Sequence, residues 1–201
     1  MYRPLDGVTI SPGFPLLLLL FALLGEETVL AALLTAAACH ELGHYLALRL
    51  CGVPVTGLRL TAFGARMDTA GRQRLSYGRE LVTVLAGPGA NALCAVFTAA
   101  LTAAFSWREG DVYTGAHVIL GGFNLLPIVP LDGGRAVGLV LSFFLGPAGG
   151  ERLCRWVSLV ALAGVLAAAA WVVVRSGGEG WLLVGAAGLA GTALREVGAG
   201  R

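Results

Sequence analysis

The stretch "AACHELGHYLALRLCG", residues 37–52, decides the fold because it places two histidines and a glutamate inside an apolar helix. A membrane-spanning helix needs about 20 mostly apolar residues, and the run over 28–48 has that length. Ionisable side chains inside such a segment are costly. Three of them within five residues, His40, Glu41 and His44, therefore indicate a shared purpose.

The composition is that of an integral membrane protein. Of 201 residues, 57% are hydrophobic and only 13% are charged, which is more apolar surface than a soluble domain of this length can bury. All 14 basic residues are Arg, the net charge is only +2, and no phosphate-binding loop motif occurs, so no nucleic-acid partner is expected. The four cysteines lie in or beside apolar runs, and we interpret them as small buried apolar residues.

Apolar runs predict an all-α polytopic membrane protein of about six transmembrane helices, forming a single intramembrane domain over 1–201. The first run is expected to be a membrane segment, not a cleavable signal, because further apolar runs follow it. The fourth run is broken near 127–134, where prolines and glycines prevent a regular helix. The predicted spans are 7–25, 28–48, 81–107, 112–145, 156–174 and 181–194.

The arginines predict how the chain is oriented. With six spans and both termini in the cytoplasm, only Arg108 and Arg175 lie outside, and the other twelve of the 14 arginines lie on the cytoplasmic side. Short cytoplasmic loops carry such an excess in membrane proteins. We therefore expect a multi-pass protein of the cell membrane, with both termini and the active-site side in the cytoplasm.

The long loop over 49–80 contains an alternating segment, TGLRLTAFGARMD at 56–68. Apolar and polar residues alternate with the period of a β-strand, and the alternation slips near Gly64, which indicates a bulge or turn. We expect a short strand or β-hairpin at the membrane surface. An irregular amphipathic loop is the alternative.

Residues 40–44 form the motif H-E-x-x-H. Positions i and i+4 share one helix face, so His40 and His44 can both present a ring nitrogen to one metal ion. Zinc lowers the pKa of a bound water to about 7, and Glu41 is close enough to take its proton. Two alternatives stay open: histidines that only hydrogen-bond neighbouring helices, and a metal site that serves transport.

Catalytic zinc sites usually have three protein ligands, so a third is needed. Asp132 offers a carboxylate and lies at the same predicted membrane depth as His44, near the cytoplasmic end of its span. His117 is predicted to lie near the outer end of its span, as an ordinary polar residue far from the zinc. Asn124 precedes the broken segment and could orient it or bind substrate or an oxyanion, with a helix-packing amide as an equal alternative. Asn91 is interpreted as a cap or packing amide.

Three motifs in order resemble those of the site-2 protease family of intramembrane zinc metalloproteases: HELGH at 40–44, AGPGAN at 86–91 and NLLPIVPLDGGR at 124–135. Phe63 and Gly64 also resemble the sporulation-type branch, the stage IV sporulation protein FB-like proteins. The sequence contains no PDZ insertion and no CBS domain, so the resemblance implies neither PDZ-mediated recognition nor nucleotide sensing.

The resemblance implies one Zn²⁺ per chain, held by His40, His44 and Asp132, with Glu41 as the catalytic base. It also supports a role for Asn124 near the site. We therefore expect an intramembrane zinc endopeptidase that cleaves a membrane-tethered protein in or near its transmembrane segment and releases a regulator such as a transcription factor. The alternative is a catalytically inactive or metal-transporting protein on the same helices.

The expected partners are the lipid bilayer and a transmembrane or membrane-tethered substrate, with a regulatory membrane protein as a further candidate. A helical peptide bond must unwind before hydrolysis, and its freed backbone groups need new partners. A strand edge supplies them by β-augmentation. We therefore expect the substrate to pair with Leu58–Phe63, and the expected substrate-binding residues are Leu58, Leu60, Phe63 and Gly64.

Overall fold

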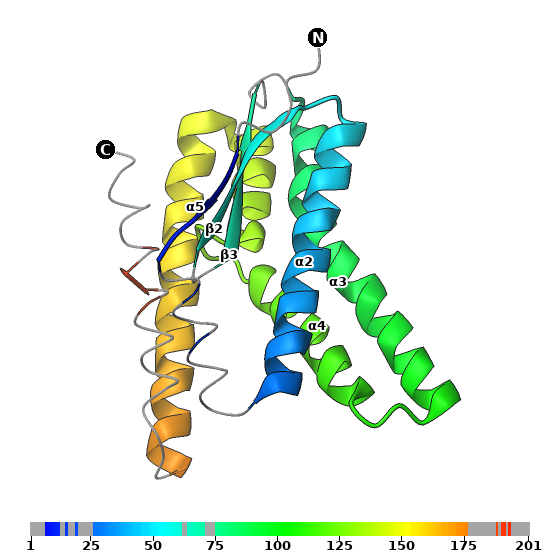
Figure 1. Cartoon of the computed structure of the whole chain (residues 1–201). Helices are drawn as coiled ribbons and strands as arrows, with labels where there is room; N and C mark the ends of the chain where they lie inside the picture. The colour runs from blue at the N-terminus through cyan, green and yellow to red at the C-terminus, as the bar shows by residue number, and fades with distance from the viewer. Residues whose placement is uncertain are drawn as a thin grey trace. The chain divides into compact units, whose positions relative to one another are not determined.

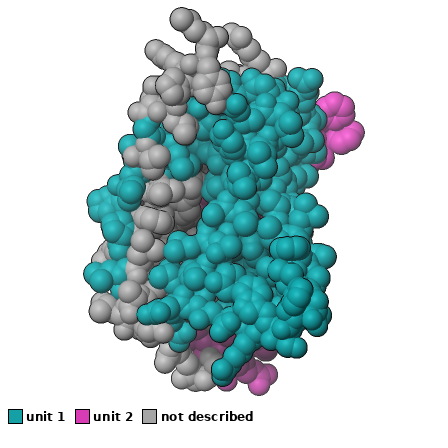
Figure 2. All heavy atoms as spheres, turned by 45° about the vertical axis from the view of Figure 1, so that its right-hand side comes forward, with its two compact units in different colours: residues 1–123 teal, residues 124–201 magenta. Residues whose placement is uncertain are grey.

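The computed structural model describes residues 7–12, 15, 19, 26–61, 64–70, 75–176, 188, 190, 191 and 193. The chain forms two compact units, residues 1–123 and 124–201, which Figure 2 shows in different colours. Each unit has buried apolar clusters of its own. The expectation of one catalytic domain over 1–201 stays a prediction.

Two long helices of the first unit, α2 (Glu27–Leu50) and α3 (Tyr77–Phe105), lie side by side (Figure 1). Their backbones meet at Gly43, where an added Cβ would collide with the carbonyl oxygen of Ala86 and lie 2.8 Å from Cβ of Ala90. Small residues at a contact allow such close approach, which is how helices associate without a hydrophobic driving force inside a bilayer.

The third helix of this unit, α4 (Gly110–Asn124), packs against both of the others. Ala32 and Ala36 of α2 form a buried cluster with Ala116 of α4. On the α3 side, an added Cβ at Gly121 would lie 3.1 Å from Cβ of Asn91. Three helices therefore enclose a narrow interior in which buried polar side chains must find partners within the protein.

A three-stranded sheet lies at the end of α2 that follows the histidines. Strands β2 (Val55–Thr61) and β3 (Gly64–Thr69) form an antiparallel hairpin, and β1 (Val8–Ile10) pairs parallel with β2. The predicted hairpin in the 49–80 loop is confirmed. The sheet is anchored by a buried cluster of Leu48, Val53 and Val55.

The sheet order β1-β2-β3 corrects two predictions. Residues 8–10 are a strand, so the predicted span over 7–25 does not begin at residue 7. Strand β2 lies in the middle of the described sheet, and Leu58 N–H already donates to Gly7 O at 3.3 Å. Leu58 and Leu60 therefore do not offer a free edge to a substrate, because β1 pairs with that side of β2.

The second unit contains α5 (Asp132–Ser176), which consists of two helices that meet at Gly146. Gly146 has φ 75° and ψ 166°, a conformation that L side chains avoid. The two halves run antiparallel, because Gly150 packs against Ser142 and Cys154 Sγ donates to Gly134 O at 3.3 Å. The segment between the predicted spans 112–145 and 156–174 is thus helical except at Gly146.

The predicted break near 127–134 is confirmed, since α4 ends at Asn124 and α5 begins at Asp132. The connecting segment is held by buried Ile128 and by a hydrogen bond from Val129 N–H to Ser158 Oγ at 3.2 Å. An added Cβ at Gly134 would collide with the backbone of Ile128, which explains why a residue without a side chain follows Asp132 so closely.

In the part of the chain that the structure describes, three helical segments are long and apolar enough to cross a membrane: Glu27–Leu50, Tyr77–Phe105 and Asp132–Arg175. They contain the predicted spans 28–48 and 156–174 and most of 81–107. Most of the predicted spans 7–25 and 181–194 lies outside the described residues. The number of six spans stays a prediction.

Candidate metal centre

His40 and His44 lie on successive turns of α2 and face each other through their Nε2 atoms, which are 3.1 Å apart. The ring centroids are 4.7 Å apart and the rings are nearly perpendicular, at 80°. Two ligands bound 2.0–2.1 Å from one tetrahedral ion lie about 3.3 Å from each other. The distance between the two imidazoles therefore already fits a shared zinc ion.

The tautomer of His44 follows from its partner. His44 Nδ1 lies 2.7 Å from the carbonyl oxygen of Thr83 on α3. A carbonyl oxygen only accepts, so Nδ1 carries the hydrogen and Nε2 keeps its lone pair. Metal-binding histidines are commonly oriented in this way by a hydrogen bond from the other ring nitrogen.

His40 is held by an amide instead. Asn91 Nδ2 lies 3.2 Å from His40 Nδ1, and His117 Nδ1 lies 3.1 Å from Asn91 Oδ1. If Nε2 of His40 binds a metal, the ring proton must be on Nδ1. The Nδ1–H group then donates a hydrogen bond to the amide oxygen of Asn91, provided that this oxygen faces His40. The oxygen and nitrogen of an amide exchange places by a half-turn of the side chain. Asn91 is therefore the positioning partner of His40.

Gly87 of α3 keeps the space beside the two imidazoles open. A Cβ at this position would collide with Nε2 of His44 and lie 2.8 Å from Nε2 of His40. Any side chain here would occupy the place where both lone pairs converge. The small residues of the AGPGAN motif thus have a specific use at Gly87, in addition to close helix packing.

These observations define the chemistry available in the first unit. Two imidazoles with fixed orientation converge on an open space, which is a donor set typical of zinc and other first-row transition metals. Glu41, which is half-buried, follows His40 directly in the sequence and carries the carboxylate of the motif. Within the residues described for this unit, the motif therefore offers two candidate metal ligands, and Glu41 as acid–base group stays a prediction.

The other predicted site residues belong to other elements of the chain. Asp132 is 8% exposed and begins α5 in the second unit, and Asn124 is the last residue of α4. Leu58 lies in β2 and Gly64 begins β3, while Phe63 lies outside the described residues. Apart from the pairing of Leu58 with a substrate strand, which the pairing of β1 with β2 excludes, their roles in binding zinc or substrate stay predictions.

His117 differs from its prediction. It is only 2% exposed and bonds to Asn91, so it is not a polar residue at the outer interface. The helix begins at Gly110, which places His117 two turns inside it. Asn91 is fully buried between the two histidines and is more than a packing amide. Its place three residues after Pro88 in AGPGAN was visible in the sequence, but its partners come from two other helices.

The fold is that of a known class of membrane protease. The chain is similar in structure to the site-2 protease from Methanocaldococcus jannaschii, with a TM-score of 0.66 and 20% sequence identity. The match covers 98% of this chain and 94% of the other. At 20% sequence identity, this structural similarity establishes the fold alone.

Comparison of the sequence with known families and proteins is more specific than the comparison of structures. Residues 28–113 match the model of Peptidase family M50, and the resemblance to site-2 proteases is confirmed. It is 32% identical over 148 residues to a protein named zinc metalloprotease Rip3 from Mycobacterium tuberculosis, covering 65% of this chain and 36% of that protein. It is 30% identical over 117 residues to zinc metalloprotease MJ0392 of M. jannaschii, covering 55% and 33%.

The chain spans about a third of the length of these curated relatives. Both relatives are named zinc metalloproteases, and three of the helices described for this chain are long and apolar enough to cross a membrane.

Proposed function

We propose that the protein is an intramembrane zinc endopeptidase that cleaves a membrane-tethered protein in or near its transmembrane segment. The observation that carries the proposal is the pair of Nε2 atoms 3.1 Å apart on α2, inside the Peptidase family M50 segment and next to Glu41. Three ionisable residues so close together on a membrane-length helix are costly without a function.

His40, His44 and Asp132 would hold one zinc ion. The geometry of the two histidines supports their part, and the oxygen chemistry of Asp132 within the L-D-G-G motif supports the third. When bound, zinc supplies Lewis acidity that activates water and polarises a carbonyl group at neutral pH. Thr83 and Asn91 would keep the two imidazoles oriented while that chemistry proceeds.

Glu41 would do the proton transfers. Its carboxylate accepts a proton from the attacking water and then donates that proton to the leaving amine nitrogen. The carboxylate returns to its starting form, so one residue serves both halves of the peptide hydrolysis. The amide of Asn124 would bind substrate or the negative charge that develops on the scissile carbonyl oxygen.

The substrate strand is proposed to pair with β3, not with β2. In the described sheet β3 is an edge strand, and β2 is paired on both sides. The backbone N–H of Leu58 bonds toward β1, so the backbone groups of the next residue, Arg59, face β3. Arg59 and its partner Arg66 therefore form a backbone hydrogen-bonded pair. The backbone groups of Ala65 and Met67 then point away from β2, where an extended substrate can take them up. Gly64 begins this edge.

The orientation and outcome are also proposals. We infer that both termini and the 49–80 loop lie in the cytoplasm, on the basis of the arginine bias. Cleavage near that side would release a membrane-tethered regulator. A cysteine introduced at Arg72 should react with a membrane-impermeant thiol reagent only after the membrane is opened, and labelling in intact cells would reverse the orientation.

The runner-up is a metal-transporting or inactive protein on the same helices. Both ligand histidines would also serve transport, but a transporter uses Glu41 only as a charge. Glu41→Gln therefore distinguishes the two proposals by peptide cleavage. Gln keeps the size of Glu but cannot accept a proton, so only the peptidase proposal predicts a loss of cleavage.

The experiment compares the membrane proteins that accumulate in cells with the wild-type protein and in cells with Glu41→Gln. Glu27→Gln, at the start of the same helix, is the matched control. An endopeptidase predicts that one or a few tethered proteins accumulate uncut with Glu41→Gln and not with the control. Identical sets of membrane proteins in all three strains would contradict the proposal.

A further inference from the structure

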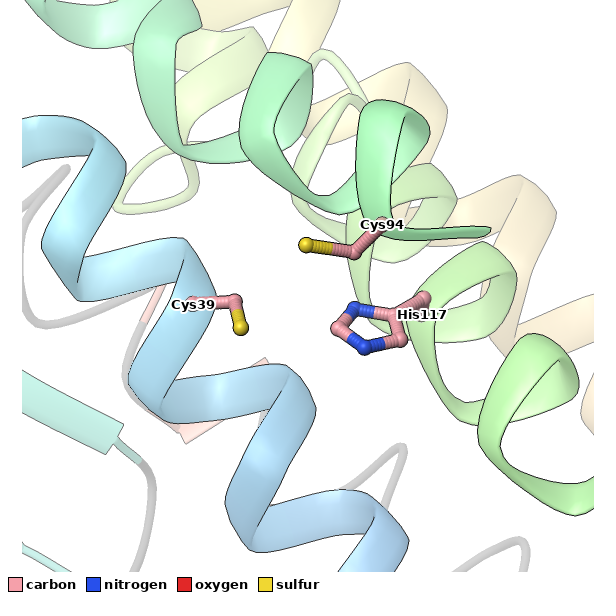
Figure 3. Close-up of side chains that lie close together, drawn as sticks. All are labelled: Cys39, Cys94 and His117. Atoms are coloured by element: carbon pink, nitrogen blue, oxygen red, sulfur yellow. The ribbon is translucent and has the colours of Figure 1, made fainter. Parts of the chain in front are cut away.

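The three helices of the first unit bring two cysteines and a histidine together (Figure 3). Cys39 comes from α2, Cys94 from α3 and His117 from α4, and their side chains gather in one place. The two sulfur atoms and one ring nitrogen all lie within 4.8 Å of one another. The peptidase chemistry proposed above uses none of these side chains as a ligand.

We propose that Cys39, Cys94 and His117 form a second metal site, which takes a soft divalent cation such as zinc. Two thiolates and one imidazole, with a fourth position for water, are a donor set that zinc accepts in proteins. Thiolate ligands favour soft and borderline cations over magnesium or calcium. The inference goes beyond the proposed protease function and does not depend on it.

The distances are close to those that an ion requires. Two sulfurs bound 2.3 Å from a tetrahedral ion lie about 3.8 Å apart, and a sulfur and a nitrogen lie about 3.6 Å apart. A contraction of about 1 Å from the present upper limit of 4.8 Å is enough. Each sulfur moves by rotation about a single side-chain bond, and the helices need not shift.

Charge decides which cation fits best. Two of the three helices that carry the cluster, α2 and α3, are of membrane length, and a net charge inside a membrane is costly. Two thiolates neutralise a divalent ion, whereas a monovalent ion would leave one negative charge uncompensated. Metal binding releases the thiol protons, so the filled site is neutral without any further partner.

The cluster is separate from the His40–His44 pair. Asn91 stands between them, with its amide near His40 Nδ1 on one side and His117 Nδ1 on the other. The imidazole of His117 is almost completely buried, and both cysteines are half-buried thiols. Substitution of a cysteine should therefore empty one site and leave the histidine pair able to bind metal.

Cobalt substitution of the full chain, purified under reducing conditions, tests the proposal. Co²⁺ bound by cysteine sulfur gives a near-ultraviolet charge-transfer band, which a site of histidine and carboxylate ligands cannot give. We expect this band in the wild type and in His44→Ala. Cys39→Ser and Cys94→Ser should lose the band and about half of the bound cobalt, since one of two sites is removed. The matched control Cys51→Ser should keep both.

Cobalt retained at the histidine pair shows that the cysteine variants are folded. The proposal is overturned if the wild type has no sulfur band while all four thiols react freely with a thiol reagent. It is also overturned if two thiols of the metal-free protein appear only after treatment with a reductant, because Cys39 and Cys94 would then form a disulfide. Loss of the band in Cys51→Ser would also contradict the proposal, because the band would then depend on a cysteine outside the cluster. The protease proposal survives each of these results.

Discussion

The two polar clusters in the first unit differ in how they are built. His40 and His44 belong to one helix, and their Nε2 atoms are 3.1 Å apart because residues at i and i+4 share a face. Cys39, Cys94 and His117 come from three helices and meet only because those helices pack together. The first arrangement is encoded in five consecutive residues, whereas the second depends on the tertiary structure.

This difference explains what could be predicted from the sequence. The H-E-x-x-H motif predicts the metal-binding face of α2 because helix geometry alone fixes it. The interpretation of Cys39 as a small apolar residue failed to anticipate Cys94 and His117 as its neighbours, because no local pattern links residues 39, 94 and 117. Packing across helices has no signature in one sequence.

The largest effect on the comparison is expected from a change at Asp132, the only ligand proposed for the zinc of the histidine pair that lies outside α2. If it completes the site, Asp132→Ala should lose the zinc of the histidine pair and all detectable cleavage, since three protein ligands hold a catalytic zinc. Zinc content by elemental analysis and cleavage of a reconstituted transmembrane substrate measure both effects. Asp111→Ala is the control. Full zinc content and cleavage in Asp132→Ala would remove Asp132 from the site.

A smaller loss of cleavage activity is expected from a change at Gly87. The Cβ of Gly87→Ala would collide with His44 Nε2, so the ion or its ligand must move. A displacement of about 1 Å at a reacting centre can cost about 100-fold in rate, and we expect a loss of that order in kcat/KM. Gly89→Ala is the matched control, because an added Cβ there meets nothing within 4 Å. Equal activity of the two variants would show that the space beside the histidines is not used.

The fold was predictable where a local pattern decides it. The alternation over 56–68 predicted the hairpin, and the prolines and glycines of 124–135 predicted the break before α5. The pairing of Val8–Ile10 with β2 was not predictable, because it joins segments 50 residues apart. The single-residue connection at Gly146 was not predicted, because the predicted span 156–174 begins only after Arg155, although charged residues also lie on exposed helix faces.

The smallest loss of cleavage activity is expected from a change in the edge strand β3. Ala65→Pro removes one backbone donor that points away from β2, and Ala65→Ser keeps it. One hydrogen bond contributes about 1 kcal/mol, so kcat/KM for a transmembrane substrate should fall about fivefold with unchanged zinc content. Proline is tolerated on an edge strand when its position needs no donor within the sheet. Equal cleavage by Ala65→Pro and Ala65→Ser would exclude strand addition at β3.

The central claim is that H-E-x-x-H provides both the metal ligands and the base of an intramembrane peptidase. The most direct measurement is cleavage of a reconstituted transmembrane substrate by purified Glu41→Gln, with metal content determined on the same sample. We predict that zinc is retained at the wild-type level and that cleavage falls by at least about 100-fold, the usual contribution of a general base. Cleavage near the wild-type rate by zinc-loaded Glu41→Gln would contradict the claim.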